Sequence, residues 1–193
     1  MKIGVLDVQG AVSEHIKHLE LCDVEAVAVK TEKQLNQVCG LILPGGESTT
    51  IGRLVELFGL ADAIRERSRE KSLSVFGTCA GMILIAKEIT DGTTGQPSLG
   101  LMDIAVKRNA FGRQRESFET SLRFKSLDEP LTAVFIRAPI IERAGEGVEA
   151  LAEMPEGTVA ARQGNLLTTS FHPELTTDLR VHRFFIAMCE EKA

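Results

Sequence analysis

A ten-residue stretch in the first half of the chain constrains its fold more than any other. The stretch reads SVFGTCAGMI from residue 74 to residue 83, and it passes from an apolar run to a helical pattern through Gly-x-Cys-x-Gly. Strand, sharp turn and helix in this order form a nucleophile elbow, which presents a reactive side chain at its apex. Glycines flank the apex because a Cβ there would crowd the neighbouring strand or helix. The pattern makes Cys79 a candidate nucleophile.

A free cysteine is more often a small buried apolar residue than a nucleophile, so Cys79 alone does not establish a function. A catalytic site also needs a base, an acid that orients the base, and donors for a developing oxyanion. The elbow supplies one donor, because the Ala80 amide lies in the first turn of the following helix and has no helical partner. The other groups must come from elsewhere in the chain.

A second motif, TSFHPEL at residues 169–175, contains a candidate base and a candidate acid. If this segment is extended, His172 and Glu174 point to the same side, because alternate residues of a strand share a face. Pro173 stiffens the pair, and a carboxylate beside an imidazole fixes its tautomer and stabilises the imidazolium. We therefore predict that Cys79, His172 and Glu174 act as nucleophile, base and orienting acid. Without the elbow, a surface His-Pro-Glu turn would be the better interpretation.

A glycine pair in the sequence PGGESTT follows the strand expected at residues 39–43. Gly-Gly at the carboxyl end of a strand can turn backbone amides toward a ligand, and ligands of open α/β sheets bind at that edge. An ordinary strand-to-helix turn explains the loop equally well, with Ser48 or Thr49 as the helix cap. A phosphate loop fits poorly because the Gly-Lys-Ser/Thr ending is missing.

The order of the expected elements indicates an α/β fold in a single domain of residues 1–193. Strands alternate with helices in the first half of the chain and follow one another in the second, which predicts a mostly parallel sheet with an antiparallel extension. The expected strands are residues 2–8, 24–29, 39–43, 73–76, 102–106, 117–122, 134–136, 148–152, 159–163 and 167–171. The expected helices are residues 11–22, 32–37, 51–58, 60–71, 80–88 and 178–190.

Composition and charge argue against several classes of function. The net charge is −5 and the chain has neither Trp nor Tyr, so nucleic acid is not the expected partner. No apolar segment resembles a signal sequence or is long enough to span a bilayer. The four cysteines are scattered without a Cys-x-x-Cys, which indicates neither a metal site nor a disulfide framework and favours a reducing, cytoplasmic setting.

Two other patterns have ordinary structural interpretations. His15 and His18 lie three residues apart on an expected helix, but no third metal ligand is near in sequence, so we predict exposed polar side chains. The basic stretch at residues 107–115 is expected to be a solvated loop, and the alternative is that one of its arginines binds a carboxylate.

The elbow, taken with the His-Pro-Glu motif, resembles the class I (triad) glutamine amidotransferases. Four further motifs resemble the glutaminase subunits of pyridoxal 5′-phosphate synthase within that class: VQG at residues 8–10, PGGESTT at 44–50, NAFGRQRESF at 109–118 and FIRAP at 135–139. The resemblance covers essentially the whole chain. Asp7 departs from it, since a small or apolar residue is expected at the entry to the Gln9 loop.

This resemblance implies a flavodoxin-like three-layer sandwich that hydrolyses L-glutamine to L-glutamate and ammonia without a cofactor or metal. Cys79 would form a glutamyl thioester, His172 would give a proton to ammonia and then activate water, and Glu174 would orient His172. The other implied site residues are Gly46 and Ala80 as oxyanion donors, Gln9 beside the oxyanion loop, and Gly46, Glu47, Ser48, Arg108, Ile136 and Arg137 around glutamine.

The resemblance also implies a partner, the synthase subunit of pyridoxal 5′-phosphate synthase, a (β/α)₈ barrel that would receive the ammonia within a hetero-oligomer. Three alternatives remain. The FGRQ and FIRAP motifs argue against a glutaminase subunit of another synthase, such as imidazole glycerol phosphate synthase, and the His-Pro-Glu motif argues against a DJ-1-like cysteine hydrolase or chaperone. The intact triad residues argue against a non-catalytic flavodoxin-like binding module.

Overall fold

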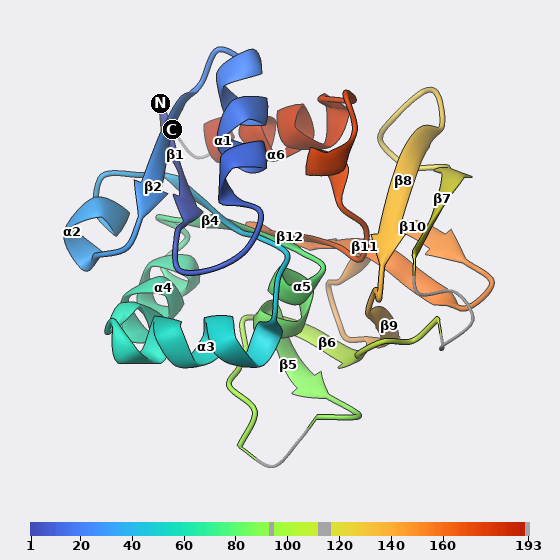
Figure 1. Ribbon diagram of the computed structural model, residues 1–193, viewed down its shortest axis with the longest axis horizontal. Helices are drawn as coiled ribbons and strands as arrows, with labels where there is room; N and C mark the ends of the chain where they lie inside the picture. Colours follow the sequence, from blue (N-terminus) through green and yellow to red (C-terminus); the bar gives the residue numbers. More distant parts are fainter. Residues whose placement is uncertain (93–94, 112–116, 192–193) are drawn as a thin grey trace.

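A computed structural model describes residues 1–92, 95–111 and 117–191 (Figure 1). Within these ranges, ten strands form one large sheet and two form a separate hairpin. The strands are β1 (Lys2–Leu6), β2 (Glu25–Val29), β3 (Gly40–Leu43), β4 (Ser74–Thr78), β5 (Ala86–Ile89), β6 (Met102–Lys107), β7 (Ser117–Leu122), β8 (Leu131–Ile136), β9 (Ile140–Ala144), β10 (Glu149–Met154), β11 (Gly157–Gln163) and β12 (Leu166–Thr169). The helices are α1 (Val12–Leu21), α2 (Glu32–Leu35), α3 (Ser48–Leu57), α4 (Leu60–Arg69), α5 (Ala80–Ile85), the 3₁₀ turn η1 (Pro173–Leu175) and α6 (Arg180–Glu190).

Five strands form the parallel part of the large sheet, in the order β2-β1-β3-β4-β12. The residues of β3, β4 and β12 are buried throughout, as expected for strands covered on both faces. Because the strands are parallel, their carboxyl ends lie at one edge of the sheet. The elbow, the PGGESTT loop and the TSFHPEL segment therefore meet at that edge, where ligands of such sheets bind.

Helices cover both faces of the sheet, which confirms the three-layer α/β arrangement (Figure 1). One core lies between the sheet and α3, α4 and α5 and includes Ile64 and Met82. The other lies between the sheet and α1 and α6 and includes Leu19, Phe76 and Phe185. Each of these five side chains is fully buried, which stabilises the fold by about 1.5–3 kcal/mol per residue.

The antiparallel extension is also confirmed. β11 runs antiparallel to β12 and to β9, and β9 runs antiparallel to β6, which pairs in parallel with β5. β10 pairs antiparallel with β11 along most of its length. The strand β9 is absent from the sequence-based prediction because only its first two residues, Ile140 and Ile141, are buried, so it lacks a strand pattern. The hairpin of β7 and β8 lies beside this part of the sheet (Figure 1).

The helix after the elbow is shorter than predicted. It ends at Ile85, and the chain continues directly as a strand. The N–H groups of Leu99 and Leu101 donate to the carbonyls of Leu84 and Ile85 at 2.7 and 2.8 Å. These carbonyls are the acceptors that another helical turn would need, so the later segment ends the helix.

Two expectations from the sequence concern membrane-spanning segments and the basic stretch. No helix within the described ranges is both long and apolar enough to cross a membrane. Residues 112–116, which carry the centre of the NAFGRQRESF motif and the end of the basic stretch, lie outside the described residues.

Candidate active site

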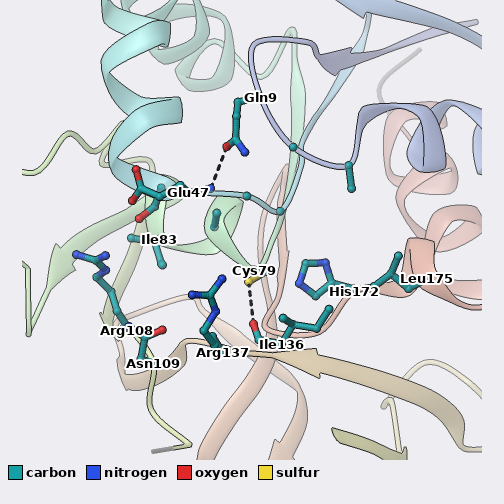
Figure 2. A pocket seen from close by; sticks show the side chains of 16 residues that line it. Gln9, Glu47, Cys79, Ile83, Arg108, Asn109, Ile136, Arg137, His172 and Leu175 are labelled. Carbon is teal, nitrogen blue, oxygen red and sulfur yellow. Dashed lines mark hydrogen bonds between the residues drawn. The ribbon is translucent and has the colours of Figure 1, made fainter. Parts of the chain in front are cut away.

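Cys79 lies at the apex of a sharp turn between β4 and α5, as the elbow pattern predicts. Its backbone has φ 49° and ψ −100°, a conformation that costs a non-glycine residue about 1–3 kcal/mol. The Cys79 N–H donates to the Thr169 carbonyl at 2.8 Å, and a Cβ on Gly81 would collide with the Leu43 carbonyl. The thiol lies 3.8 Å from the Ile136 carbonyl oxygen (Figure 2). The neighbouring strands thus hold the strained turn in place.

The pairing of β12 with β4 brings His172 to Cys79. Thr169 pairs with Thr78 in parallel register, and the chain that leaves β12 reaches His172 beside Cys79 (Figure 2). The His172 N–H donates to the Val134 carbonyl of β8 at 2.8 Å, which fixes the backbone at this point. Two motifs far apart in the sequence therefore face one another at adjacent strand ends.

The imidazole of His172 and the carboxylate of Glu174 are hydrogen bonded. His172 Nδ1 lies 2.7 Å from Glu174 Oε1. The prediction that an extended segment brings the two side chains together is wrong, because residues Pro173–Leu175 form a 3₁₀ turn. Proline suits the first position of such a turn, where an N–H has no partner within the turn, and the turn carries the carboxylate back to the imidazole.

The surroundings of this pair favour its charged forms. Burial lowers the pKa of His172, but hydrogen bonds with Cys79 and Glu174 and the charges of these groups raise the pKa to about 10. Burial raises the pKa of Glu174, but His15 and His172 outweigh burial and hold the pKa below its usual range. At neutral pH His172 therefore carries a proton on each ring nitrogen, and Glu174 is ionised.

A cavity of about 530 Å³ opens at the elbow (Figure 2). All the predicted site residues except Glu174 line it: Gln9, Gly46, Glu47, Ser48, Cys79, Ala80, Arg108, Ile136, Arg137 and His172. Glu174 is 3% exposed and lies behind the imidazole. The lining also includes residues to which the sequence assigned no role in the site: Gly10, Gly45, Ile83, Asn109 and Leu175, which belong to the motifs, and Ala11. Most of these adjoin a predicted residue in the sequence, and that adjacency is the signal that marks them.

Two further residues of the cavity have strained backbones. Asn109 and Arg137 have φ of 40° and 42°. With Cys79 they make up three of the five non-glycine residues that have positive φ within the described ranges. Such strain concentrates where the surrounding structure holds a functional geometry. Figure 2 shows the Arg137 side chain extending into the cavity, where it can meet an anionic group.

Glu47 caps the helix after the glycine pair, so the prediction of Ser48 or Thr49 as the cap is wrong. The Glu47 carboxylate accepts the N–H groups of Thr49 and Thr50 at 3.0 and 2.7 Å and the Thr50 hydroxyl at 2.6 Å. Burial raises the pKa of Glu47, but these hydrogen bonds outweigh burial and lower the pKa to about 2. The carboxylate is thus occupied by the cap, and the Glu47 carbonyl accepts the Ile51 N–H at 2.9 Å.

The Gln9 segment fixes the position of the glycine pair. Gln9 Oε1 accepts the Glu47 N–H at 2.9 Å (Figure 2), and the Gly45 carbonyl accepts the Ala11 N–H at 3.3 Å. The C=O and N–H of a planar trans peptide point in opposite directions. The Gly46 N–H therefore points away from Ala11, and the contact with Ala11 does not use it.

Arg108 is joined to the glycine loop through Gln96. Arg108 Nη1 donates to Gln96 Oε1 at 2.7 Å, and Gln96 Nε2 donates to Ser48 Oγ at 3.3 Å. The Arg108 backbone N–H donates to Asp91 Oδ1 at 2.8 Å. These bonds hold the guanidinium at the cavity. Gln96 lies in a polar loop without periodicity, so the sequence carries no signal for it.

The histidines of α1 are buried, so the prediction that they are exposed is wrong. His15 is 0% exposed and His18 is 6% exposed. His15 Nε2 lies 3.3 Å from Thr78 Oγ1 and 3.5 Å from Glu174 Oε2, directly behind the predicted triad. Within the part of the chain that the structure describes, no three His, Cys, Asp or Glu side chains are grouped to hold a metal ion.

Asp7, which departs from the expected pattern, makes its contacts away from the cavity lining. Its carboxylate lies 3.1 Å from Lys30 Nζ, in a partly exposed ion pair. The Asp7 N–H donates to the Val29 carbonyl at 2.9 Å, which extends the pairing of β1 with β2. The fold thus accommodates an aspartate at this position, beside the first loop.

A solved structure described as a glutamine amidotransferase is similar over nearly the whole chain. It superposes with a TM-score of 0.93 at 49% sequence identity, and the match covers 97% of this chain and 98% of that chain. The shared fold defines a class I glutamine amidotransferase. The model of the SNO glutamine amidotransferase family matches residues 5–191. The chain belongs to that family.

Curated relatives match end to end. A protein of Niallia circulans named pyridoxal 5′-phosphate synthase subunit PdxT is 54% identical over 191 residues, which cover 99% of each chain. A protein of the same name from Pelotomaculum thermopropionicum is 55% identical over 190 residues, which cover 98% of this chain and 95% of that one.

Proposed function

We propose that this chain is the glutaminase subunit of a pyridoxal 5′-phosphate synthase and that it hydrolyses L-glutamine to L-glutamate and ammonia. Cys79, His172 and Glu174 are the catalytic residues of the proposal. The observation that carries it is the 2.7 Å contact between His172 Nδ1 and Glu174 Oε1, beside a cysteine at the apex of an elbow. The end-to-end match to relatives named subunit PdxT supports this particular synthase.

In the first half of the proposed reaction, Cys79 Sγ, whose proton has passed to His172, attacks the side-chain carbonyl carbon of glutamine. The carbon–sulfur bond forms as the carbonyl electrons move to oxygen. The raised pKa of His172 keeps a proton on its Nε2, and this proton passes to the amide nitrogen as the carbon–nitrogen bond breaks. Ammonia leaves and a glutamyl thioester remains on Cys79.

In the second half, neutral His172 takes a proton from water. The oxygen of this water attacks the thioester carbonyl, and the carbon–sulfur bond breaks to release glutamate. The Cys79 sulfur keeps the bonding electrons and His172 keeps the proton, so the site returns to its starting state. Glu174 accepts the His172 Nδ1 hydrogen bond throughout, which stabilises the imidazolium whenever it forms.

Two backbone amides are proposed to stabilise the oxyanion in both halves. The Ala80 N–H lies in the first turn of α5, next to the nucleophile, and needs no helical acceptor. The Gly46 N–H takes no part in the contact with Ala11, and the docked synthase subunit is proposed to turn it toward the substrate. Donors of this kind contribute about 10²–10³-fold in rate each.

Glutamine is proposed to bind along the cavity lining. Its charged α-carboxylate and α-ammonium groups need partners of opposite charge or polar backbone groups. Arg108 and Arg137 supply the positive charge, and the backbones of Gly46, Ser48 and Ile136, beside Glu47, supply polar groups. The cavity is large enough for an amino acid of this size.

The proposed partner is the synthase subunit, a (β/α)₈ barrel that receives the ammonia within a hetero-oligomer. Free ammonia released into neutral water becomes mostly ammonium, which is not a nucleophile, so hydrolysis is useful only when the two subunits are docked. The Gly45-Gly46 peptide can rotate with little steric cost, and Gln9 and Ala11 hold it from a neighbouring loop. A partner that bears on this loop would reorient an oxyanion donor.

The test is glutamate release from L-glutamine by the purified chain, with and without the synthase subunit. We expect release in the presence of the synthase subunit, and a rate lower by roughly 10²–10³-fold in its absence, as when one oxyanion donor is misplaced. Equal rates in both conditions would refute the coupling and leave the triad assignment intact. No glutamate in either condition would refute the proposed activity.

A further inference from the structure

All four histidines of the chain are buried, although the proposed reaction uses only one. His15, His18, His172 and His182 are each at most 8% exposed. His15 and His18 lie on α1, and His182 lies on α6. The His15 ring centroid is 5.2 Å from that of His182, and the His18 centroid is 4.7 Å from it. Three buried imidazoles thus form one cluster behind the predicted triad.

The cluster adjoins an oxygen atom that lacks a partner. Glu174 Oε1 is bonded to His172, but Glu174 Oε2 is buried and has no hydrogen-bond partner within the described residues. The nearest cluster atom is His15 Nε2, at 3.5 Å. A buried carboxylate oxygen without a donor is costly. Whether His15 Nε2 carries a proton therefore affects the stability of the ionised Glu174 carboxylate.

The hydrogen bonds of the cluster assign its protons. His15 Nδ1 and His182 Nε2 are 2.9 Å apart, so one of them donates to the other. If His15 donated, its Nε2 lone pair would face the Glu174 carboxylate, and His182 Nδ1 would be a buried N–H without an acceptor. If His182 donates, His15 Nε2 carries a proton and lies 3.3 Å from Thr78 Oγ1 and 3.5 Å from Glu174 Oε2. The second arrangement avoids both penalties, and we assign it.

We propose that His15 is a positioning residue of this site, whose Nε2–H holds the second carboxylate oxygen of Glu174 and ties it to the strand that bears Cys79. The proposal rests on the proposed function. His15 Nε2 lies 3.3 Å from Thr78 Oγ1, and Thr78 precedes the nucleophile in the sequence. The same N–H therefore connects the elbow strand to the turn that carries the base and the acid. His182 fixes the ring from the other side.

Burial keeps His15 a neutral donor. The titratable groups that face it are Glu14 and His18 on its own helix, His172 and Glu174 on the turn, and His182 on α6. Burial lowers the pKa of His15 to about 4, and the attraction of Glu174 only partly opposes this. At neutral pH His15 thus acts through one oriented N–H, and it is not a second base.

The test compares variants of the full chain in the presence of the synthase subunit. His15→Leu removes the N–H, whereas His15→Gln offers an amide N–H at the distance of Nε2. His18→Gln is the matched control, because His18 is a buried histidine of the same helix whose ring nitrogens contact the carbonyls of Glu14 and Thr176 instead. If His15→Leu does not fold, His15→Asn takes its place, since its shorter amide does not reach Glu174.

We expect His15→Leu to lower kcat on the order of 10²-fold, as for a misplaced catalytic group, with little change in KM for glutamine. Loss of the donor destabilises the ionised form of Glu174, so the acid limb of the kcat profile should move to higher pH. His15→Gln should restore both properties, and His18→Gln should leave the acid limb in place. A merely structural role for His15 would lower stability without moving this limb.

A second measurement does not depend on activity. The His172 Nδ1 proton reports the hydrogen bond to Glu174 by nuclear magnetic resonance of the full chain. Its resonance should move or broaden in His15→Leu and return in His15→Gln. If the wild-type chain releases no glutamate, the proposed function fails while this comparison still tests the contact. An unchanged resonance and an unchanged acid limb in His15→Leu would overturn the proposal.

Discussion

The side chain of Gln9 accepts a hydrogen bond from the Glu47 backbone N–H at 2.9 Å, so a residue of the first loop holds the loop that follows β3. Both residues line the cavity at the elbow. The glycine pair before Glu47 offers little steric resistance to rotation of its peptide. The orientation of this peptide therefore depends on Gln9 and on anything that moves the first loop.

We expect Gln9→Ala to lower the kcat of the glutaminase, measured with the synthase subunit bound, by roughly 10²–10³-fold, the effect of removing one oxyanion donor. KM for glutamine should change less, because Gln9 acts on the loop. Gln9→Glu is the matched control, since it keeps an acceptor at the same position and should retain more activity. Equal losses in the two variants, or a change in KM alone, would contradict this role of Gln9.

Cys79→Ala should abolish glutamate release while the circular dichroism spectrum stays unchanged, because only the group that forms the thioester is lost. A diazo-ketone analogue of glutamine should label Cys79 and none of the other cysteines. Cys189 is buried and neither Cys22 nor Cys39 lines the cavity. Mass spectrometry of the labelled chain checks this, and a label on any other cysteine would refute the assignment.

His172→Asn should lower kcat nearly as much as Cys79→Ala, because the members of a triad act as a unit. Glu174→Gln should be milder, since Glu174 orients the imidazole and transfers no proton. Loss of its charge should also lower the pKa of His172, which Glu174 raises. Initial rates of glutamate release across a range of pH measure both effects. Turnover close to wild type in His172→Asn would mean that another residue is the base.

Stability should fall in mild acid. Folding lowers the pKa of His15 from 6.5 to about 4, chiefly through burial. The unfolded chain therefore binds more protons than the folded chain between these two values, and the free energy of unfolding falls as the pH falls from about 6.5 toward 4. A shift of this size corresponds to at most about 3 kcal/mol. Burial lowers the pKa of His182 as well, which acts in the same direction.

Urea unfolding of the wild type and of His15→Gln at several pH values between 7.5 and 4.5 measures this dependence. The variant should lose less free energy of unfolding over the same range, whatever its stability at neutral pH. If the free energies of unfolding of the two proteins fell in parallel as the pH is lowered, His15 would not contribute to the loss of stability in acid.

The parts of the site that the sequence predicts are those whose chemistry and spacing are local. Cys79 is marked by its flanking glycines, and His172 and Glu174 are two residues apart, so each motif is complete within a few residues. The parallel sheet then brings both motifs to the same edge, as the alternation of strands and helices predicts. The backbone conformation around Glu174 could not be predicted in the same way, because an extended segment and a 3₁₀ turn both place the carboxylate near the imidazole.

The parts that the sequence does not predict depend on distant or competing partners. His15 lies at a helical spacing typical of a polar face, and its burial depends on His182, 167 residues away. Glu47 stands beside Ser48 and Thr49, which are preferred cap residues whereas Glu is not, so local preference selects the wrong residue. Helix α5 ends early because of hydrogen bonds from a segment that follows a polar loop.

The position of β12 also determines when the site can exist during synthesis of the chain. β12 is among the last elements to be made, yet it lies between β4 and β11 and supplies the Thr169 carbonyl that holds the Cys79 amide. Until it inserts, β4 presents an unpaired edge, which favours association with other chains. A nascent chain, or one cut before residue 166, therefore carries Cys79 without His172 and with an aggregation-prone edge beside it.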